Sequence, residues 1–256
     1  MASALTMRSG HARTATNRAE IKAVCLDVDD TLVDFTRAAR SALFALIGRD
    51  DMWPAWQRAT DEFVARCVSG ELDSTTMREL RTKAFFAEQL GIQLDDHTVT
   101  ALEARRLTRM CAAWRLFPDV VPCLDWLRAA GLRIAAVTNA SGGPQQHAKL
   151  ADMGITRYFD AVLIAGELGA AKPDPRIFHA ACQRLHVQPH QTVHIGDRLD
   201  LDAVGARDAG LHGVWLNRDT TDQHPTPPPD IHQIADLEDL PELLVWHYAT
   251  VPTPRR

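Results

Sequence analysis

An acidic cluster directly follows a short apolar segment near the N-terminus and is the first candidate for chemistry. Residues 21–26 are rich in branched and apolar side chains, which is typical of a buried strand, and Asp27, Asp29 and Asp30 come immediately after them. Ligands of open parallel sheets bind beyond the carboxyl ends of the strands, so we expect these acids to face a crevice. Because side chains two residues apart point the same way in extended chain, Asp27 and Asp29 can reach one substrate atom together.

Later segments place other polar residues at comparable positions. Buried strands are predicted over residues 132–137 and 191–195, because both are short runs with branched apolar side chains. A helix is predicted over residues 176–185, after a proline-containing segment that favours extended chain. The polar residues of these segments are Thr138 and Asn139 after the first strand, Lys172 before the helix, and Asp197 and Asp202 after the second strand.

This combination of side chains predicts a magnesium site beside a site for a phosphoryl group. Several carboxylates on one rim repel each other unless a hard cation lies among them, and Mg²⁺ takes oxygen ligands. A lysine and a hydroxyl next to Mg²⁺ would bind a dianionic phosphoryl group, whose transfer is catalysed mainly by positioning and charge stabilisation. An aspartate at the centre favours covalent catalysis through an aspartyl-phosphate, with the second carboxylate holding and accepting the proton.

The four segments resemble, in order and spacing, the motifs of the haloacid dehalogenase-like hydrolase superfamily, specifically its phosphatase branch with a helical cap. The resemblance covers about residues 24–216. It implies that Asp27 is the nucleophile and Asp29 the general acid/base. The other implied roles are substrate binding by Thr138, Asn139 and Lys172, and magnesium binding by the side chains of Asp27 and Asp197, by the backbone carbonyl of Asp29, and through Asp202 in a supporting role.

One stretch and one departure bear on the substrate. Residues 138–160, which include Gln145 and Lys149, are similar to the branch that contains nucleotide 5'-phosphatases and acylneuraminate-phosphate phosphatases. Arg198 stands where a small hydroxyl residue is usual in the superfamily, and it adds positive charge beside the predicted metal site. The metabolite itself is not predicted, because specificity depends on a cap whose sequence has no readable code.

Three alternatives remain beside a phosphatase. The 2-haloacid dehalogenases resemble this pattern but have no acid at the position of Asp29, since a halide leaves without a proton. A phosphomutase would keep both acids, and only the residues of the cap would distinguish it. A non-catalytic phosphate-binding regulatory module is disfavoured, because binding alone requires neither the nucleophile Asp27 nor a proton donor.

The long separation between Asp27 and Thr138 predicts an inserted unit. A strand-helix-strand crossover takes about 30 residues or a little more, so this interval contains additional structure. Residues 37–114 are therefore predicted to form a helical cap, which can exclude water and recognise the leaving group. The predicted cap helices cover about residues 55–68, 74–90 and 95–114. The remaining predicted parts are a disordered tail over residues 1–20 and an α/β core, with a doubly wound (Rossmann-like) parallel sheet, over residues 21–36 and 115–256.

Composition limits the classes of partner. The chain has 256 residues, 46% of them hydrophobic, and a formal net charge of -5, which argues against a general nucleic-acid binder. No apolar run approaches the length of a membrane span. Its five scattered cysteines are expected to be reduced, as is typical of a cytoplasmic protein. We therefore expect a small phosphorylated metabolite as the partner, and the sequence does not predict the oligomeric state.

Two further groups of side chains are interpreted as structural. Aromatic residues of the predicted cap have a spacing compatible with amphipathic packing, so we interpret them as helix core rather than as a surface that stacks a base. The histidines are interpreted as surface or packing residues rather than as a second metal site, because two of them lie seven residues apart on a predicted helix while the others flank or enter a strand. These residues are Trp53, Trp56, Phe63, Phe85 and Phe86, and His179, His186, His190 and His194.

Overall fold

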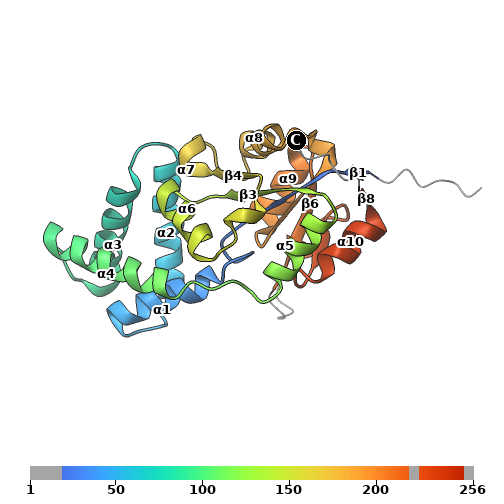
Figure 1. The fold of residues 1–256 in the computed structure, drawn as a ribbon. Coiled ribbons are helices and arrows are strands. Elements are labelled where there is room, and N and C mark those ends of the chain that lie inside the picture. Colours follow the sequence, from blue (N-terminus) through green and yellow to red (C-terminus); the bar gives the residue numbers. More distant parts are fainter. Residues whose placement is uncertain (1–18, 219–224, 251–256) are drawn as a thin grey trace, which may run out of the picture.

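Within residues 19–218 and 225–250, which the computed structural model describes, six parallel strands form the central sheet in the order β4-β3-β2-β5-β6-β7. The strands are β2 (Ala23–Leu26), β3 (Arg133–Thr138), β4 (Ala161–Ile164), β5 (Thr192–Gly196), β6 (His212–Leu216) and β7 (His232–Ile234). The chain runs from β2 to β4 on one side and then returns to β5 on the other, so the strand order reverses beside β2 (Figure 1). The predicted doubly wound α/β core is confirmed, and β7 is the predicted final edge.

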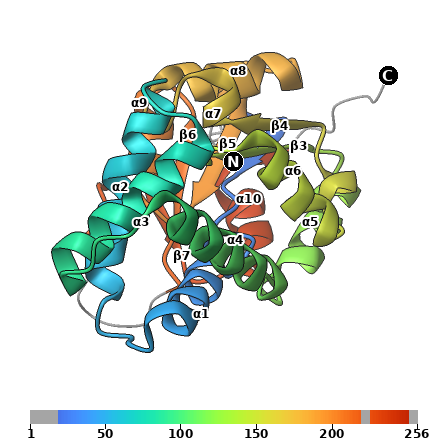
Figure 2. The ribbon, with the colours of Figure 1, turned by 90° about the vertical axis from the view of Figure 1, so that its left-hand side faces the viewer.

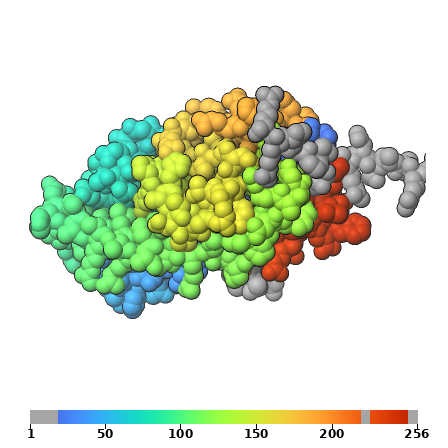
Figure 3. Space-filling model, in the orientation of Figure 1, coloured from blue at the N-terminus to red at the C-terminus, as the bar shows by residue number. Residues whose placement is uncertain are grey.

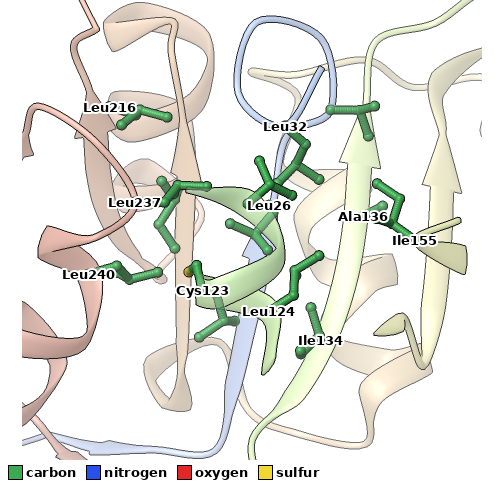
Figure 4. Close-up of a cluster of buried hydrophobic side chains, with 14 of the residues drawn as sticks. Leu26, Leu32, Cys123, Leu124, Ile134, Ala136, Ile155, Leu216, Leu237 and Leu240 are labelled. Atoms are coloured by element: carbon green, nitrogen blue, oxygen red, sulfur yellow. The ribbon is translucent and has the colours of Figure 1, made fainter. Parts of the chain in front are cut away.

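Alternation along β2 divides the core into two hydrophobic layers. Val24 and Leu26 pack in one cluster, whereas Ala23 and Cys25 pack in the other, because successive side chains of a strand point to opposite faces. Figure 4 shows Leu26 directed toward Leu124 on the first face. Full burial of such a leucine contributes roughly 2 kcal/mol. The first layer includes residues of α5 (Val120–Ala129), α6 (Gly143–Asp152) and α10 (Asp239–His247), and the second includes residues of α8 (Pro175–Leu185) and α9 (Gly205–Asp208).

Short elements complete the core. They are β1 (Glu20–Ile21), β8 (Ala249–Thr250), α7 (Ala165–Leu168), the 3-10 turns η1 (Thr156–Tyr158) and η2 (Pro189–Gln191), and the π-helical turn η3 (Leu199–Val204). β1 and β8 pair in parallel as a separate small sheet. The predicted tail falls almost entirely on residues 1–18, outside the described residues, but Glu20 belongs to β1.

Four helices lie between β2 and α5 and gather at one end of the molecule (Figures 1 and 2). They are α1 (Phe35–Ile47), α2 (Trp53–Val68), α3 (Ser74–Leu90) and α4 (Asp96–Ala112). The last three lie where cap helices were predicted. α1 was not predicted as a separate helix, and it begins two residues before the predicted cap boundary. The division of the chain at residues 37 and 114 remains a prediction.

Local signals explain where these helices begin and end. The Asp73 carboxylate accepts hydrogen bonds from the backbone N–H groups of Thr75 and Thr76, at 2.8 and 3.0 Å, and so caps α3. Gly48 and Gly91 end α1 and α3 in the left-handed conformation that glycine adopts without steric cost. No helix of the described residues combines the length and the apolar character needed to span a bilayer.

The aromatic residues of the cap form much of its own core. Trp56 is 2% exposed, and its ring meets that of Phe85 edge to face at 5.0 Å between centroids. Phe86 and Leu43 are buried in the same cluster. These contacts agree with the interpretation of Trp56 and Phe85 as packing residues.

Candidate active site

The carboxyl ends of three neighbouring strands bring the candidate residues together. Asp27 follows β2, Thr138 ends β3 and Asp197 follows β5, so all three lie beside the point where the strand order reverses. The backbone N–H of Asp27 donates to the carbonyl of Ile195 at 2.9 Å, which fixes the start of the acidic loop against β5. A crevice at such a reversal is the usual ligand site of a doubly wound sheet.

Lys172 lies at the centre of the site and is 5% exposed. Its ammonium group donates to Oδ1 of Asp27 and to Oδ1 of Asp202, both at 2.6 Å, and to the carbonyl of Val137 at 2.9 Å. Burial alone would lower the pKa of Lys172, but Asp202 and Asp27 raise it above its ordinary range. Lys172 therefore carries a fixed positive charge between two carboxylates.

Asp202 is held from several sides. Burial alone would raise its pKa, but Lys172 and His194 hold the pKa of Asp202 well below its ordinary range. Nε2 of His194 lies 2.9 Å from Oδ1, and the backbone N–H of Arg198 donates to Oδ2 at 3.1 Å. A Cβ at position 196 would overlap the Asp202 carboxyl group, so the close approach of η3 to β5 requires Gly196.

Asp27, Asp197 and Asp202 each offer a carboxylate oxygen, and these oxygens all lie within 4.8 Å of one another. Burial and repulsion from Asp202, opposed by Lys172, raise the pKa of Asp27 to about 7. Burial and repulsion from Asp27 and Asp202 raise the pKa of Asp197 to about 9. A buried group of repelling carboxylates without enough cationic partners favours a divalent cation.

Asp197 provides the clearest test of the fit to a metal. Its backbone N–H donates to the Thr31 hydroxyl at 3.1 Å, and its carbonyl accepts from the indole N–H of Trp215 at 2.8 Å. Among the described residues, no hydrogen bond or ion pair reaches its carboxylate. The backbone is thus fixed while the carboxylate remains available, which suits an oxygen ligand of Mg²⁺.

Asp29 lies on the same loop but has a different partner. The Lys149 ammonium group of α6 donates to Oδ1 of Asp29 at 2.6 Å. That ammonium group also lies 4.8 Å from the ring centre of Phe35 and 5.1 Å from that of Trp114. The Lys149 side chain is 3% exposed. A buried lysine therefore orients the carboxylate that was predicted to be the acid/base.

Thr138 and Asn139 have different surroundings. Thr138 is buried, and its hydroxyl accepts a hydrogen bond from the Gln146 side chain at 3.3 Å. Both polar ends of Asn139 are engaged by the Lys172 backbone, because its amide donates to the Lys172 carbonyl at 2.9 Å and its oxygen accepts from the Lys172 N–H at 2.8 Å. Asn139 therefore holds the segment that carries Lys172, and its contact with substrate remains a prediction.

A cavity of about 920 Å³ joins the site to the cap. Its lining includes Asp27 and Lys172 of the core together with Trp56, Arg81 and Arg106 of the cap. Figure 3 shows the cap, cyan to green, lying directly against the yellow core segment on one face of the molecule. The volume exceeds what a phosphoryl group alone requires and is typical of a site for a whole small molecule.

Comparison with known proteins identifies the family. Residues 21–210 match the family model of the haloacid dehalogenase-like hydrolases. The chain belongs to this family. A glyceraldehyde 3-phosphate phosphatase of Methanopyrus kandleri is 31% identical over 210 residues, which cover 77% of this hydrolase and 84% of the relative. The N-acylneuraminate-9-phosphatase of Mus musculus is 29% identical and covers 88% of this chain and 94% of its own.

A solved structure agrees with the fold of this hydrolase. A haloacid dehalogenase-like (HAD) hydrolase from Bacillus subtilis, bound to magnesium, matches with a TM-score of 0.73 and 23% identity, over 88% of this chain and 99% of that chain. At this identity the likeness shows the fold alone. The predicted resemblance to the superfamily is confirmed, and so is the prediction of an enzyme with phosphatase relatives.

Sequence reasoning assigned no role to several residues of this hydrolase that the structure brings to the site. Lys149 contacts Asp29, Gln146 contacts Thr138, and His194 contacts Asp202 instead of serving only as a packing residue. The signal for Lys149 was its place on the buried face of an amphipathic helix, where a lysine needs a partner. Arg198 is exposed and pairs with Asp200 at 3.3 Å.

Proposed function

We propose that this hydrolase cleaves the phosphomonoester bond of a small phosphorylated metabolite, with Mg²⁺, through an aspartyl-phosphate on Asp27. The observation that carries the proposal is the convergence of the Asp27, Asp197 and Asp202 carboxylates, of which the first and the last also pair with the buried Lys172 ammonium group. The named activities of the two relatives support the same reaction class.

The side chains of Asp27 and Asp197 would hold the metal, with Asp202 in support and the Asp29 backbone carbonyl as a further ligand. A bound Mg²⁺ would neutralise the acids and stabilise negative charge on the phosphoryl oxygens. Asp202 is already engaged by Lys172 and His194, which suits a supporting role. Asp197 has its carboxylate available for direct coordination.

In the first step, a carboxylate oxygen of Asp27 attacks phosphorus. The new O–P bond forms as the bond between phosphorus and the leaving oxygen breaks, and Asp29 gives its proton to that oxygen. Lys172 and Thr138 bind the phosphoryl oxygens and hold the group in line with the nucleophile. Oδ1 of Asp27 accepts from Lys172, while no hydrogen bond within the described residues reaches Oδ2, so Oδ2 is available for attack.

In the second step, water attacks phosphorus and Asp29 takes a proton from it. The bond between phosphorus and Asp27 breaks, which releases inorganic phosphate and restores both aspartates. Residues of the cap line the same cavity, and we expect the cap to limit the access of bulk water during the first step. The same two acids therefore serve both halves of the reaction.

The proposal is tested by hydrolysis of p-nitrophenyl phosphate with Mg²⁺ and with EDTA. We expect Mg²⁺-dependent release of p-nitrophenol by the native chain and none by Asp27→Asn. The control is Asp208→Asn, which changes an exposed acid of α9. Acid quenching followed by peptide mass spectrometry should locate the phosphoryl adduct on the peptide that contains Asp27. Native turnover by Asp27→Asn, or an adduct elsewhere, would refute the assignment of the nucleophile.

A further inference from the structure

Three arginines of the cap belong to the lining of the cavity, which residues of the core also line. Arg78 and Arg81 come from α3 and Arg106 from α4, two helices that pack side by side (Figure 2). Arg81 is 4% exposed and Arg106 3% exposed, whereas Arg78 is half-buried. Charged side chains are seldom buried in this number without a balancing set of opposite charges.

Two of the arginines are fixed in place by one acid and one ring. Glu103 accepts from Nε and Nη2 of Arg106, both at 2.9 Å, and its two oxygens each lie 3.3 Å from Nη2 of Arg81. The Trp56 ring lies 4.2 Å from the Arg81 guanidinium and 5.4 Å from that of Arg106. Thr82 donates a further hydrogen bond to Glu103 at 2.5 Å. The guanidinium groups are therefore held rigidly before any ligand binds.

The positive charge of this cluster is not balanced by the described residues. Glu103 is shared by Arg81 and Arg106, and Arg78 has no ion pair with any described acid. The nearest polar partners of Arg78 are the side-chain oxygens of Thr75 and Gln145, at 3.3 and 3.5 Å. Nε of Arg81 is buried without a hydrogen-bond partner among the described residues. A buried donor without a partner, beside a cavity, indicates a place for an acceptor from a ligand.

We propose that Arg78, Arg81 and Arg106 form a second anion-binding subsite, which recognises a carboxylate or second phosphoryl group on the leaving group of the substrate. This proposal rests on the proposed phosphomonoester hydrolysis and names its substrate class. The guanidinium fork of Arg78, which no described carboxylate occupies, matches either anion with paired hydrogen bonds, and Nε of Arg81 is a further donor without a partner among the described residues. The anion would balance the excess charge, while Lys172 and the acids of the core act on the phosphoryl group at the other side of the same cavity.

The other charged residues that line the cavity do not replace this ligand. Lys149 is paired with Asp29, Lys172 with Asp27, Arg176 with Asp174, and Arg198 with Asp200. The cap acid on the lining is Asp61 of α2, and its charge acts on Arg198: burial lowers the pKa of Arg198, but Asp200, Asp197 and Asp61 together raise it. The excess positive charge is therefore confined to the α3 and α4 side of the cavity.

The test compares matched substrates that differ in one anionic group. The first pair is glycerol 1-phosphate and 3-phosphoglycerate, which tests a carboxylate, and the second is fructose 6-phosphate and fructose 1,6-bisphosphate, which tests a phosphoryl group. We expect kcat/KM of the native enzyme to favour the anion-bearing member of at least one pair by about tenfold or more. The pair that shows the preference identifies the anion.

Substitutions assign that preference to the cap arginines. Arg78→Gln should reduce the ratio of kcat/KM within the preferred pair by about tenfold, and Arg78→Lys should restore part of it. Arg78 is only half-buried, so its replacement should destabilise the fold less than replacement of the buried Arg81. The control is Arg105→Gln, which changes an exposed arginine of α4 and should leave the ratio at its native value.

Binding by Asp27→Asn separates failure of the subsite from failure of the proposed function. Titration calorimetry with the same compounds measures the ratio of dissociation constants without turnover. If the native enzyme hydrolyses no phosphomonoester but the Asp27→Asn variant still prefers the anionic member, the proposed reaction fails and the subsite stands. Equal binding within both pairs, or a ratio that Arg78→Gln does not change, would show that the arginines only stabilise the cap.

Discussion

The Lys149 ammonium group lies 2.6 Å from Oδ1 of Asp29, although the two residues belong to distant segments of the chain. Lys149 is enclosed by the rings of Phe35, at the start of α1, and Trp114, just after α4. The proposed acid/base is therefore oriented by a residue that also contacts both ends of the cap. A change at Lys149 should affect proton transfer more than phosphoryl binding.

Lys149→Met tests this positioning role. Loss of the ion pair leaves Asp29 free to rotate, and misplacement of a catalytic group by about 1 Å can reduce turnover up to 100-fold. We expect kcat to fall about 10- to 100-fold for glycerol 1-phosphate. The decrease should be smaller for p-nitrophenyl phosphate, whose leaving group needs little protonation. An equal decrease for both substrates would indicate a structural role instead, and Lys22→Met, far from the cavity lining, is the control.

Asp29→Asn removes the proposed proton donor but keeps the size of the side chain. General acid-base catalysis typically contributes 10²- to 10⁴-fold, so we expect kcat to fall by about that factor. The dissociation constant for inorganic phosphate, measured by calorimetry with Mg²⁺, should stay within about threefold of its native value, because Lys172 and Thr138 remain. Lost phosphate binding with unchanged turnover would contradict the acid/base role.

The predicted site residues that the structure brings together share a simple origin. Asp27, Thr138 and Asp197 follow or end strands, and the carboxyl ends of parallel strands meet at one edge of the sheet. The contacts that sequence reasoning missed include those of Lys149 and Gln146 on α6, which join a helix to a loop and to a strand, and the placement of a helix against the sheet depends on packing rather than on local pattern. Lys149 meets Asp29 only because α6 packs beside the acidic loop.

The cap illustrates the same limit. Its helices follow from local periodicity and from capping residues such as Asp73 and Gly91. Arg106 lies three residues after Glu103 on α4, a spacing that favours their pairing, but the contact of Arg81 with the same carboxylate requires α3 and α4 to be side by side, which no spacing in the sequence predicts. Asn139 is an example at a single position. Its side chain was predicted to bind substrate, but the structure shows it hydrogen-bonded to the Lys172 backbone.

Magnesium should stabilise this hydrolase more at high pH than at low pH. In the metal-free fold the pKa of Asp27 is about 7 and that of Asp197 about 9, both above their ordinary values, so the folded state binds protons more tightly than the unfolded state. Their contribution to stability is present at low pH and is lost as pH rises through these pKa values. Mg²⁺ replaces the protons, so its binding releases them and strengthens as pH rises.

This expectation is checked by thermal unfolding with Mg²⁺ and with EDTA, at pH 6 and at pH 8.5. The increase in Tm due to Mg²⁺ should be larger at pH 8.5. Asp197→Asn should reduce that increase, because it removes the available carboxylate. An increase that is equal at the two pH values, or larger at pH 6, would contradict competition between protons and the metal.

Glu103→Gln should destabilise the fold. Glu103 is 4% exposed and is the carboxylate that pairs with both Arg81 and Arg106. Removing one partner from a buried ion pair leaves an uncompensated charge and costs about 3 kcal/mol or more in the free energy of unfolding. Urea unfolding measures this change, with Glu88→Gln, at an exposed position of α3, as the control.

If the arginines bind an anion as proposed, 3-phosphoglycerate or fructose 1,6-bisphosphate should recover part of the stability that Glu103→Gln loses, since a ligand anion then supplies the missing charge. A loss of stability no larger than that of Glu88→Gln would mean that Glu103 does not balance the buried arginines.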